Sequence, residues 1–134
     1  MSNPEEHINA MQMAFIASPV IASYSVVRIW ADADDGYMRI RAILVNGDFL
    51  ESAEYFVVHG DEITTVDYRH QWMDGDKQTL RKRRDCTPDH PELDNFPHHV
   101  HHGGEDRVEP GLPTSMLSLL GYLESQMPFE EEAT

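Results

Sequence analysis

The stretch from Tyr37 to Val58, YMRIRAILVNGDFLESAEYFVV, holds two segments rich in β-branched and aromatic residues, with Asn46-Gly47 between them. Asn-Gly is a strong signal for a tight β-hairpin, because a type I′ turn requires positive φ at both central positions. A connection this short forces the two strands to be antiparallel neighbours. The sequence therefore predicts an antiparallel hairpin in this stretch.

Similar segments flank the hairpin. Ala22–Asp32, Glu62–Asp74 and Lys77–Cys86 are also rich in residues that favour strands, and the short breakers DADDG, HGD and GD separate the segments. With Tyr37–Val45 and Asp48–Val58 they make five expected strands. We therefore expect an α+β domain, in which an antiparallel meander of about five strands packs one face against an N-terminal and a C-terminal helix.

The two helices are predicted at the ends of this strand region. The start at Asn3–Glu6 suits a capped helix, and apolar residues at helical spacing extend it over Pro4–Ala17. Thr114 or Ser115 can cap a second helix that ends near Met127. Its apolar stripe consists of Met116, Leu119, Leu120 and Leu123.

At 134 residues the chain is expected to form a single domain, residues 1–134, with a core at about 4–127 and a disordered tail at 128–134. Between Cys86 and the second helix, five prolines predict a long irregular segment. The basic run Arg81–Arg84 is expected on an edge strand. Such a strand cannot be buried on both faces, and cationic side chains protect an edge from aggregation.

The composition is strongly acidic, with 24 acidic residues against 10 basic ones and a formal charge of −14. This charge would repel nucleic acid and anionic membranes at long range. Residues 68–107 differ, because seven basic residues oppose eight acidic ones and six histidines accompany them. This segment is close to neutral and becomes positive as its imidazoles protonate.

No stretch approaches the roughly 20 consecutive apolar residues of a membrane helix, and the N-terminal residues are acidic where a secretory signal would be basic. Cys86 is the only cysteine, which excludes an internal disulfide and a CxxC site. We therefore expect a cytoplasmic protein that does not contact a membrane. An exposed sheet edge or an apolar helix face could pair two copies into a homodimer.

The most unusual segment is the histidine-rich stretch HPELDNFPHHVHHGG, residues 90–104. Imidazoles at this density, with acidic residues upstream, are chemically sufficient to bind zinc or nickel. However, the side chains of HHVHH alternate between two faces, so a tetrahedral site would need further ligands from elsewhere in the chain. The sequence shows no second ligand cluster outside the segment. We therefore predict no metal and no cofactor, and keep a histidine-rich metal-binding protein as an alternative.

Residues 68–103, YRHQWMDGDKQTLRKRRDCTPDHPELDNFPHHVHHG, resemble the signature of the TumE family of toxins of toxin–antitoxin systems, in its longer subgroup. The likeness extends over roughly residues 20–125, and HPELDNFPHHVH is its most specific part. It implies a small cytosolic toxin, an antitoxin encoded by a neighbouring gene, and an activity on RNA. Three positions depart from the pattern, since Arg84 replaces an aromatic residue, Cys86 an asparagine and Asp89 a histidine.

The resemblance implies no established catalytic residues, so the residues themselves must suggest the chemistry. Metal-independent cleavage of RNA needs a base, an acid and cations around the phosphate, and the sequence offers all three. The expected catalytic residues are His98, His99, His101, Tyr68, Arg84 and Asp85, and the expected substrate-binding residues are Arg69, Arg81, Arg83 and His90. We predict that the histidines line a cationic pocket with Arg84 and the strand of Tyr68, in an endoribonuclease, although only one of the Tyr68 and Arg69 faces of that strand can point into the pocket.

The alternative to this prediction is a structural role for the histidines. Histidines next to prolines can hydrogen-bond backbone groups that lack a sheet or helix partner, and so lock a loop without catalysing anything. In that case the protein would bind a partner or serve a structural role.

Overall fold

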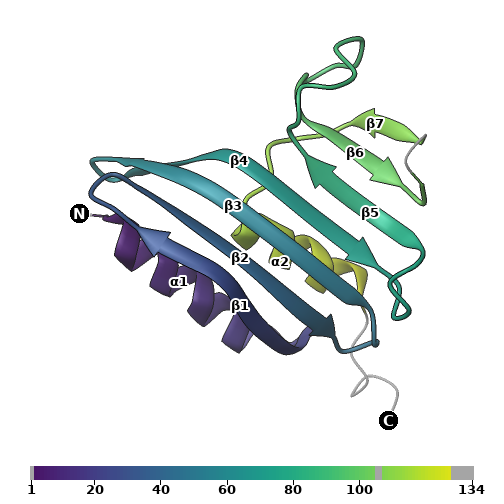
Figure 1. Ribbon diagram of the computed structural model, residues 1–134, viewed down its shortest axis with the longest axis horizontal. Coiled ribbons are helices and arrows are strands. Elements are labelled where there is room, and N and C mark those ends of the chain that lie inside the picture. Colours follow the sequence, from purple (N-terminus) through teal and green to yellow (C-terminus); the bar gives the residue numbers. More distant parts are fainter. Residues whose placement is uncertain (1, 105–106, 128–134) are drawn as a thin grey trace.

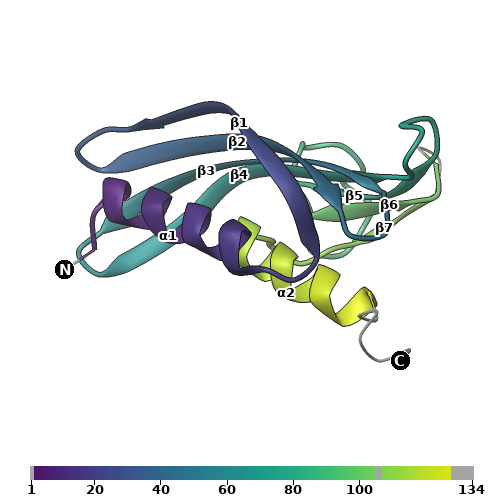
Figure 2. The same cartoon turned by 90° about the horizontal axis from the view of Figure 1, so that it is seen from below.

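The computed structural model describes residues 2–104 and 107–127, which form an antiparallel sheet with two helices on one face (Figures 1 and 2). The expected tail at 128–134 lies outside the described residues. The elements are α1 (Pro4–Ala17), β1 (Ile21–Ala31), β2 (Asp35–Leu44), β3 (Phe49–His59), β4 (Glu62–Met73), β5 (Leu80–Asp85), β6 (His99–His102), β7 (Val108–Pro110) and α2 (Met116–Gln126). The α+β class and the position of the helices are confirmed.

Each strand pairs with its neighbour in the chain, so the sheet is a meander in the order β1 to β7. The expected number of five strands was too low, because the described residues form seven. The additional strands β6 and β7 arise in the segment that was expected to be irregular. Pro97 precedes β6, and Pro110 lies on the edge strand β7, so neither proline interrupts an interior strand.

The prediction that the basic run lies on an edge strand was wrong, since β5 pairs with β4 on one side and β6 on the other. Its cationic side chains are accommodated by individual partners. The guanidinium of Arg84 lies 4.5 Å from the ring centre of Tyr122, and the Nζ of Lys82 lies 5.0 Å from the same ring. Arg83 donates from Nε to Asp85 at 3.1 Å.

The hairpin between β2 and β3 is confirmed, but its turn is not the expected type I′. Gly47 has φ +91°, whereas Asn46 does not have positive φ. The Gly47 N–H donates to the Leu44 carbonyl, and the Leu44 N–H donates to the Asp48 carbonyl. This is the pattern of a three-residue loop in which a left-handed glycine follows a type I turn.

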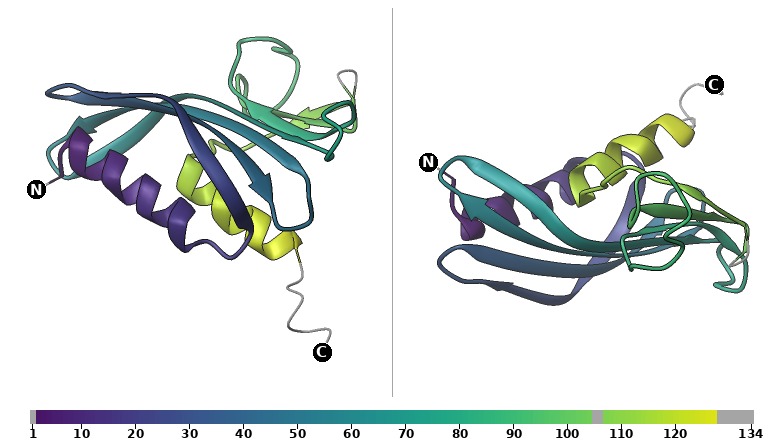
Figure 3. Two further views of the ribbon diagram at one scale, coloured as in Figure 1. Left: turned by 60° about the horizontal axis from the view of Figure 1, so that its bottom comes forward. Right: turned by 90° about the horizontal axis from the view of Figure 1, so that it is seen from above.

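The core lies between the sheet and the two helices, which both lie against one face of the sheet (Figures 2 and 3). The helix caps are confirmed: Asn3 accepts from the Glu6 N–H at 2.8 Å, and Ser115 caps α2. The expected apolar stripe of α2 is buried. This helix is also held by the sheet, because the carboxylate of Glu54 accepts from the Met116 N–H at 2.8 Å.

A buried histidine fixes the segment that leads into α2. His70 lies on β4, and its two ring nitrogens contact the Ser52 hydroxyl at 2.7 Å and the Thr114 carbonyl at 2.8 Å. Because Thr114 offers only an acceptor there, Nε2 carries the proton and Nδ1 accepts from Ser52. Burial lowers the pKa of His70 to about 4. The ring is therefore neutral and structural at neutral pH.

Candidate functional site

The register of the sheet divides the expected site residues between two faces. Arg84 lies opposite His70 and Val100, so its side chain is on the face that the helices cover. Asp85 lies opposite Arg69 and His99, so it is on the open face. The expected single pocket is therefore two separate groups of residues.

On the helix-covered face, Tyr68 and His98 lie beside the segment that leads into α2, and Arg84 packs against Tyr122 of α2. The Tyr68 hydroxyl lies 2.8 Å from Nδ1 of His98, and the two rings stack with 5.8 Å between centres. Burial, above all, raises the pKa of Tyr68 well above its ordinary value. The phenol therefore stays protonated near neutral pH and is unsuited to act as a base.

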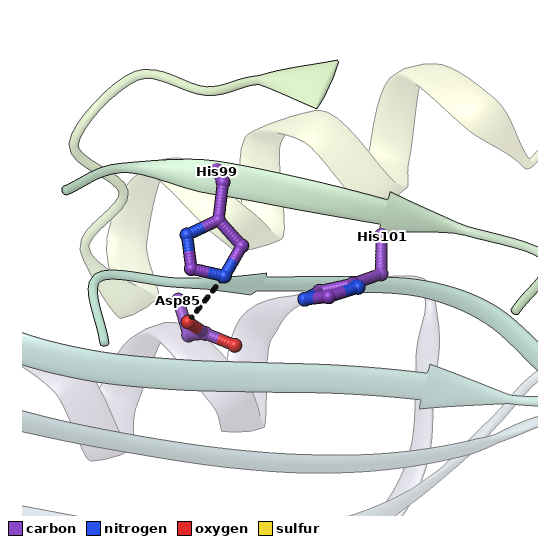
Figure 4. A group of neighbouring side chains, drawn as sticks. All are labelled: Asp85, His99 and His101. Atoms are coloured by element: carbon purple, nitrogen blue, oxygen red, sulfur yellow. Dashed lines mark ion pairs between the residues drawn. The ribbon is translucent and has the colours of Figure 1, made fainter. Parts of the chain in front are cut away.

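On the open face, β5 and β6 bring together the open-face cluster, which consists of Asp85, His99 and His101 (Figure 4). Nε2 of His99 lies 2.9 Å from Oδ1 of Asp85, and the ring centres of His99 and His101 are 4.9 Å apart. All three residues are buried, with exposed fractions of 4% for Asp85, 2% for His99 and 5% for His101. They belong together because alternation along β6 directs positions 99 and 101 to the same face.

The hydrogen bonds of His99 indicate its charge. Nδ1 lies 2.9 Å from the Pro97 carbonyl oxygen, which can only accept, and Nε2 faces Asp85. A neutral imidazole has a single N–H. Both contacts are therefore hydrogen bonds when the ring is an imidazolium and Asp85 is a carboxylate. The geometry thus favours a buried ion pair.

Asp85 is held from two further directions. Nε of Arg83 donates to Oδ2 at 3.1 Å, and the Thr87 N–H donates to Oδ1 at 3.1 Å. Charge-assisted hydrogen bonds of this kind are stronger than neutral ones and fix the carboxylate. The rigid carboxylate in turn orients His99.

The remaining expected residues lie at different distances from the cluster. His90 packs edge-on against both imidazoles, with ring centres 5.3 Å from His99 and 6.0 Å from His101. Arg69 pairs with Asp85 in register and donates to Gln71 at 3.0 Å. Arg81 does not join the cluster, since its Nε lies 2.7 Å from Asp48.

The open-face cluster could also hold a metal ion. Each of its residues offers one ligand atom, and the three atoms lie within 4.8 Å of one another. The hydrogen bond from His99 Nδ1 to the Pro97 carbonyl is the outer-shell contact that orients many metal-bound histidines. Two histidines and a carboxylate suit zinc or another divalent transition metal. The absence of a resident metal stays a prediction.

A pocket of about 290 Å³ opens on the same face, beside the cluster. Its walls include side chains of β2, β3 and β4, none of which was expected at a site: Tyr37, Arg39, Glu51, Ala53, Tyr55 and Asp67. Arg69 and Thr87 also line it, and both adjoin Asp85. The alternation of side chains along each strand indicates which residues share a face. Only the pairing of the strands shows that these residues are neighbours.

Cys86 is not an activated thiol. Its pKa is raised to about 11, chiefly by burial, with smaller contributions from Asp67 and Asp85. A thiol of this kind is mostly protonated at neutral pH and is a poor nucleophile. The residue that departs from the family pattern at this position therefore adds no obvious reactive group.

The open sheet face thus carries buried imidazoles, a fixed carboxylate and arginines, which are groups that acid–base chemistry can use. The comparison with family models is more specific, since the model described as Toxin TumE matches residues 12–127. The chain belongs to this toxin family, as the sequence resemblance indicated. No curated protein and no solved structure matches the chain. Among the described residues, no helix is long and apolar enough to cross a membrane.

Proposed function

We propose that this toxin cleaves RNA at the open-face cluster. The observation that carries the proposal is the contact between two buried imidazoles, one of them ion-paired with Asp85, beside the guanidinium of Arg83. Two histidines in different protonation states are what acid–base cleavage of RNA requires. The helix-covered group of Tyr68, His98 and Arg84 serves a structural role in this proposal.

The chemistry can be assigned to particular groups. His101 takes the proton of the 2′-hydroxyl, whose oxygen attacks phosphorus, and the imidazolium of His99 gives a proton to the departing 5′-oxygen. The products are a 2′,3′-cyclic phosphate and a 5′-hydroxyl end. Arg83 and Arg69 stabilise the charge that develops on the phosphoryl oxygens. Asp85 is a positioning residue, because it acts through His99.

Access to the cluster involves the segment that precedes β6. Because His90 packs against both catalytic rings, substrate must displace its side chain to reach them. This side chain is only half-buried, and its contact with Glu92 is an exposed ion pair at 3.6 Å. Exposed pairs of this kind are worth about 0–1 kcal/mol, so the displacement costs little.

The test is inducible expression of wild-type protein and the variants His99→Gln, His101→Gln and Asp85→Asn, followed by RNA gels. His102→Gln is a matched control, because His102 is on the same strand but faces away from the cluster. The three cluster variants should restore growth and remove RNA fragments, whereas the control should remain toxic. Circular dichroism at the temperature of the growth assay should show that each variant is still folded, which excludes loss of folding as the cause although the cluster variants are less stable than wild type.

A metal-dependent hydrolase is a second candidate, favoured by the spacing of the three ligand atoms. The two mechanisms differ in their products and in their response to chelators. Cleavage that persists in EDTA and leaves 5′-hydroxyl ends supports acid–base chemistry. Cleavage that stops in EDTA and returns with a divalent ion supports the metal site. Arrest of growth without RNA fragments would favour a toxin that only binds or inhibits its target.

The neighbouring gene is proposed to encode a protein antitoxin, on the strength of the toxin family. Co-expression with that gene should restore growth to cells that express the wild-type toxin. If growth stays arrested although both proteins accumulate, that gene does not encode the antitoxin.

A further inference from the structure

Apart from Arg69, the pocket beside the open-face cluster is not used by the chemistry above. We call it the aromatic pocket, and the residues that line it include Tyr37, Arg39, Glu51, Ala53, Tyr55 and Arg69. Its volume of about 290 Å³ is at the lower end of the range for small-ligand sites, which is about 300–1,000 Å³. It therefore has room for one planar group rather than a large ligand.

The pocket exists because a small side chain lies between larger ones. Ala53 is opposite Arg39 on β2 and opposite Arg69 on β4, so two guanidinium groups flank a methyl group. Tyr37 and Tyr55 lie opposite each other two positions along the strands. Their rings are supported by Trp30, which lies 6.3 Å from Tyr37 and 6.1 Å from Tyr55 between ring centres.

The polar groups of the pocket are of both signs. Glu51 accepts from Arg39 and Arg41. Burial alone would raise the pKa of Glu51, but these two guanidinium groups outweigh it and hold the pKa below its ordinary value. A site for phosphate alone would not include the carboxylates of Glu51 and Asp67. Aromatic faces combined with donors and acceptors at their margin are instead the features that bind a nucleobase.

The pocket is connected to the proposed catalytic residues. Ala53, Arg69, Asp85 and His99 are directly opposite one another on successive strands. Neighbouring strands are about 4.8 Å apart, so the pocket floor is roughly 10 Å from Asp85. Thr87 belongs to both places, since it lines the pocket and donates its N–H to Asp85.

We infer that the aromatic pocket receives one base of a single-stranded RNA, next to the bond that the open-face cluster cleaves. The base stacks on the tyrosines, and Glu51 and Arg39 contact its edge, while Arg69 stays with the phosphate. This inference rests on the proposed function, and it adds that the toxin is selective for a base near the cleavage site. Double-stranded RNA would not fit, because its bases are paired and stacked.

The experiment measures binding without cleavage, by fluorescence anisotropy with short 2′-O-methyl oligonucleotides of A, C, G or U. These lack the free 2′-hydroxyl that the reaction needs. Wild-type protein should bind one of the four at least fivefold more tightly than the others. Ala53→Leu fills the pocket, and should weaken binding at least tenfold and remove the preference. Ala22→Leu makes the same change on the exposed edge strand β1, outside the pocket, and should leave binding within twofold.

Folding is checked by thermal melts, and Ala53→Val is the milder replacement should Ala53→Leu not fold. A folded Ala53 variant that binds with wild-type affinity and base preference would overturn the inference. Equal binding of all four oligonucleotides by wild-type protein would also overturn it. Failure of the catalytic proposal is distinguishable, because it shows as absence of RNA cleavage by wild-type protein and leaves this binding result unaffected.

Discussion

Asp85 and His99 lie directly opposite each other on β5 and β6, and their side chains form an ion pair of 2.9 Å with almost no exposure to solvent. Such a pair gains strong electrostatic attraction, but both partners lose their hydration. Its effect on stability therefore depends on whether one partner or both are removed. This dependence can be measured.

The first prediction concerns this pair. Asp85→Ala leaves a buried imidazolium without its counter-ion and should lower the free energy of unfolding by about 3–5 kcal/mol. The double variant Asp85→Ala with His99→Gln should cost less than the sum of the single variants, by at least about 1 kcal/mol. Urea unfolding measures all three. The exposed pair of His90 and Glu92 is the control, and Glu92→Gln should change stability by less than about 0.5 kcal/mol. Additive costs at Asp85 and His99 would contradict the ion pair.

The second prediction is a dependence of stability on pH through His70. Its pKa is about 4 in the folded protein, against an ordinary value of 6.5. Between these values the unfolded chain binds a proton that the folded protein does not, so stability falls as pH decreases from about 6.5 towards 4. The full effect is of the order of 3 kcal/mol. Urea unfolding at several pH values should show a shallower decrease for His70→Phe than for wild type. Parallel curves would contradict the assignment.

The third prediction concerns the β2–β3 turn. Gly47→Ala should destabilise the protein by about 1 kcal/mol or more, because φ is +91° there and alanine is strained in that conformation. No atom lies within 4 Å of the added methyl group, so the loss would report backbone strain alone. Gly121 lies inside α2, also has free space, and does not have positive φ. Gly121→Ala should therefore stabilise the protein by up to about 1 kcal/mol. Thermal melts of the two variants should shift in opposite directions.

The fourth prediction concerns the thiol of Cys86. With its pKa near 11, the thiolate fraction at pH 8 is roughly a hundredfold below that of a thiol with the ordinary pKa of 9.0. Alkylation by iodoacetamide should be slower than for the same protein in denaturant by a comparable factor. Equal rates would mean that the folded environment does not protect the thiol. Cys86→Ser should leave toxicity unchanged.

The sheet could be predicted in part because its first five strands have a regular alternation and short connections. β6 and β7 could not, because their pairing depends on β5, which precedes them by more than ten residues and carries charges typical of an edge. Two prolines near their ends also suggested irregular structure. His99–His102 is an interior strand because it forms hydrogen bonds with β5 and β7, and the local sequence does not indicate these long-range partners.

The sequence indicates the residue types of the proposed site, but it does not indicate how they are arranged. Alternation already separates Arg84 from Asp85, and it places Tyr68 and His70 together, as their stacked rings confirm. Which of these faces is open depends on the helices, which are distant in sequence. The aromatic pocket was missed for a related reason, since Tyr37 and Tyr55 become neighbours only through strand register.

The hydrogen bond between Glu54 and the start of α2 spans 62 positions of the chain, whereas every strand pairs with the next. Loop-closure entropy increases with the length of chain that must be closed. Formation of the sheet closes short loops, and the docking of α2 closes a long one. We therefore expect a folding pathway in which the meander forms early and the docking of α2 on the sheet limits the folding rate. Amides of α2 should then become protected from hydrogen exchange later than those of β2 and β3.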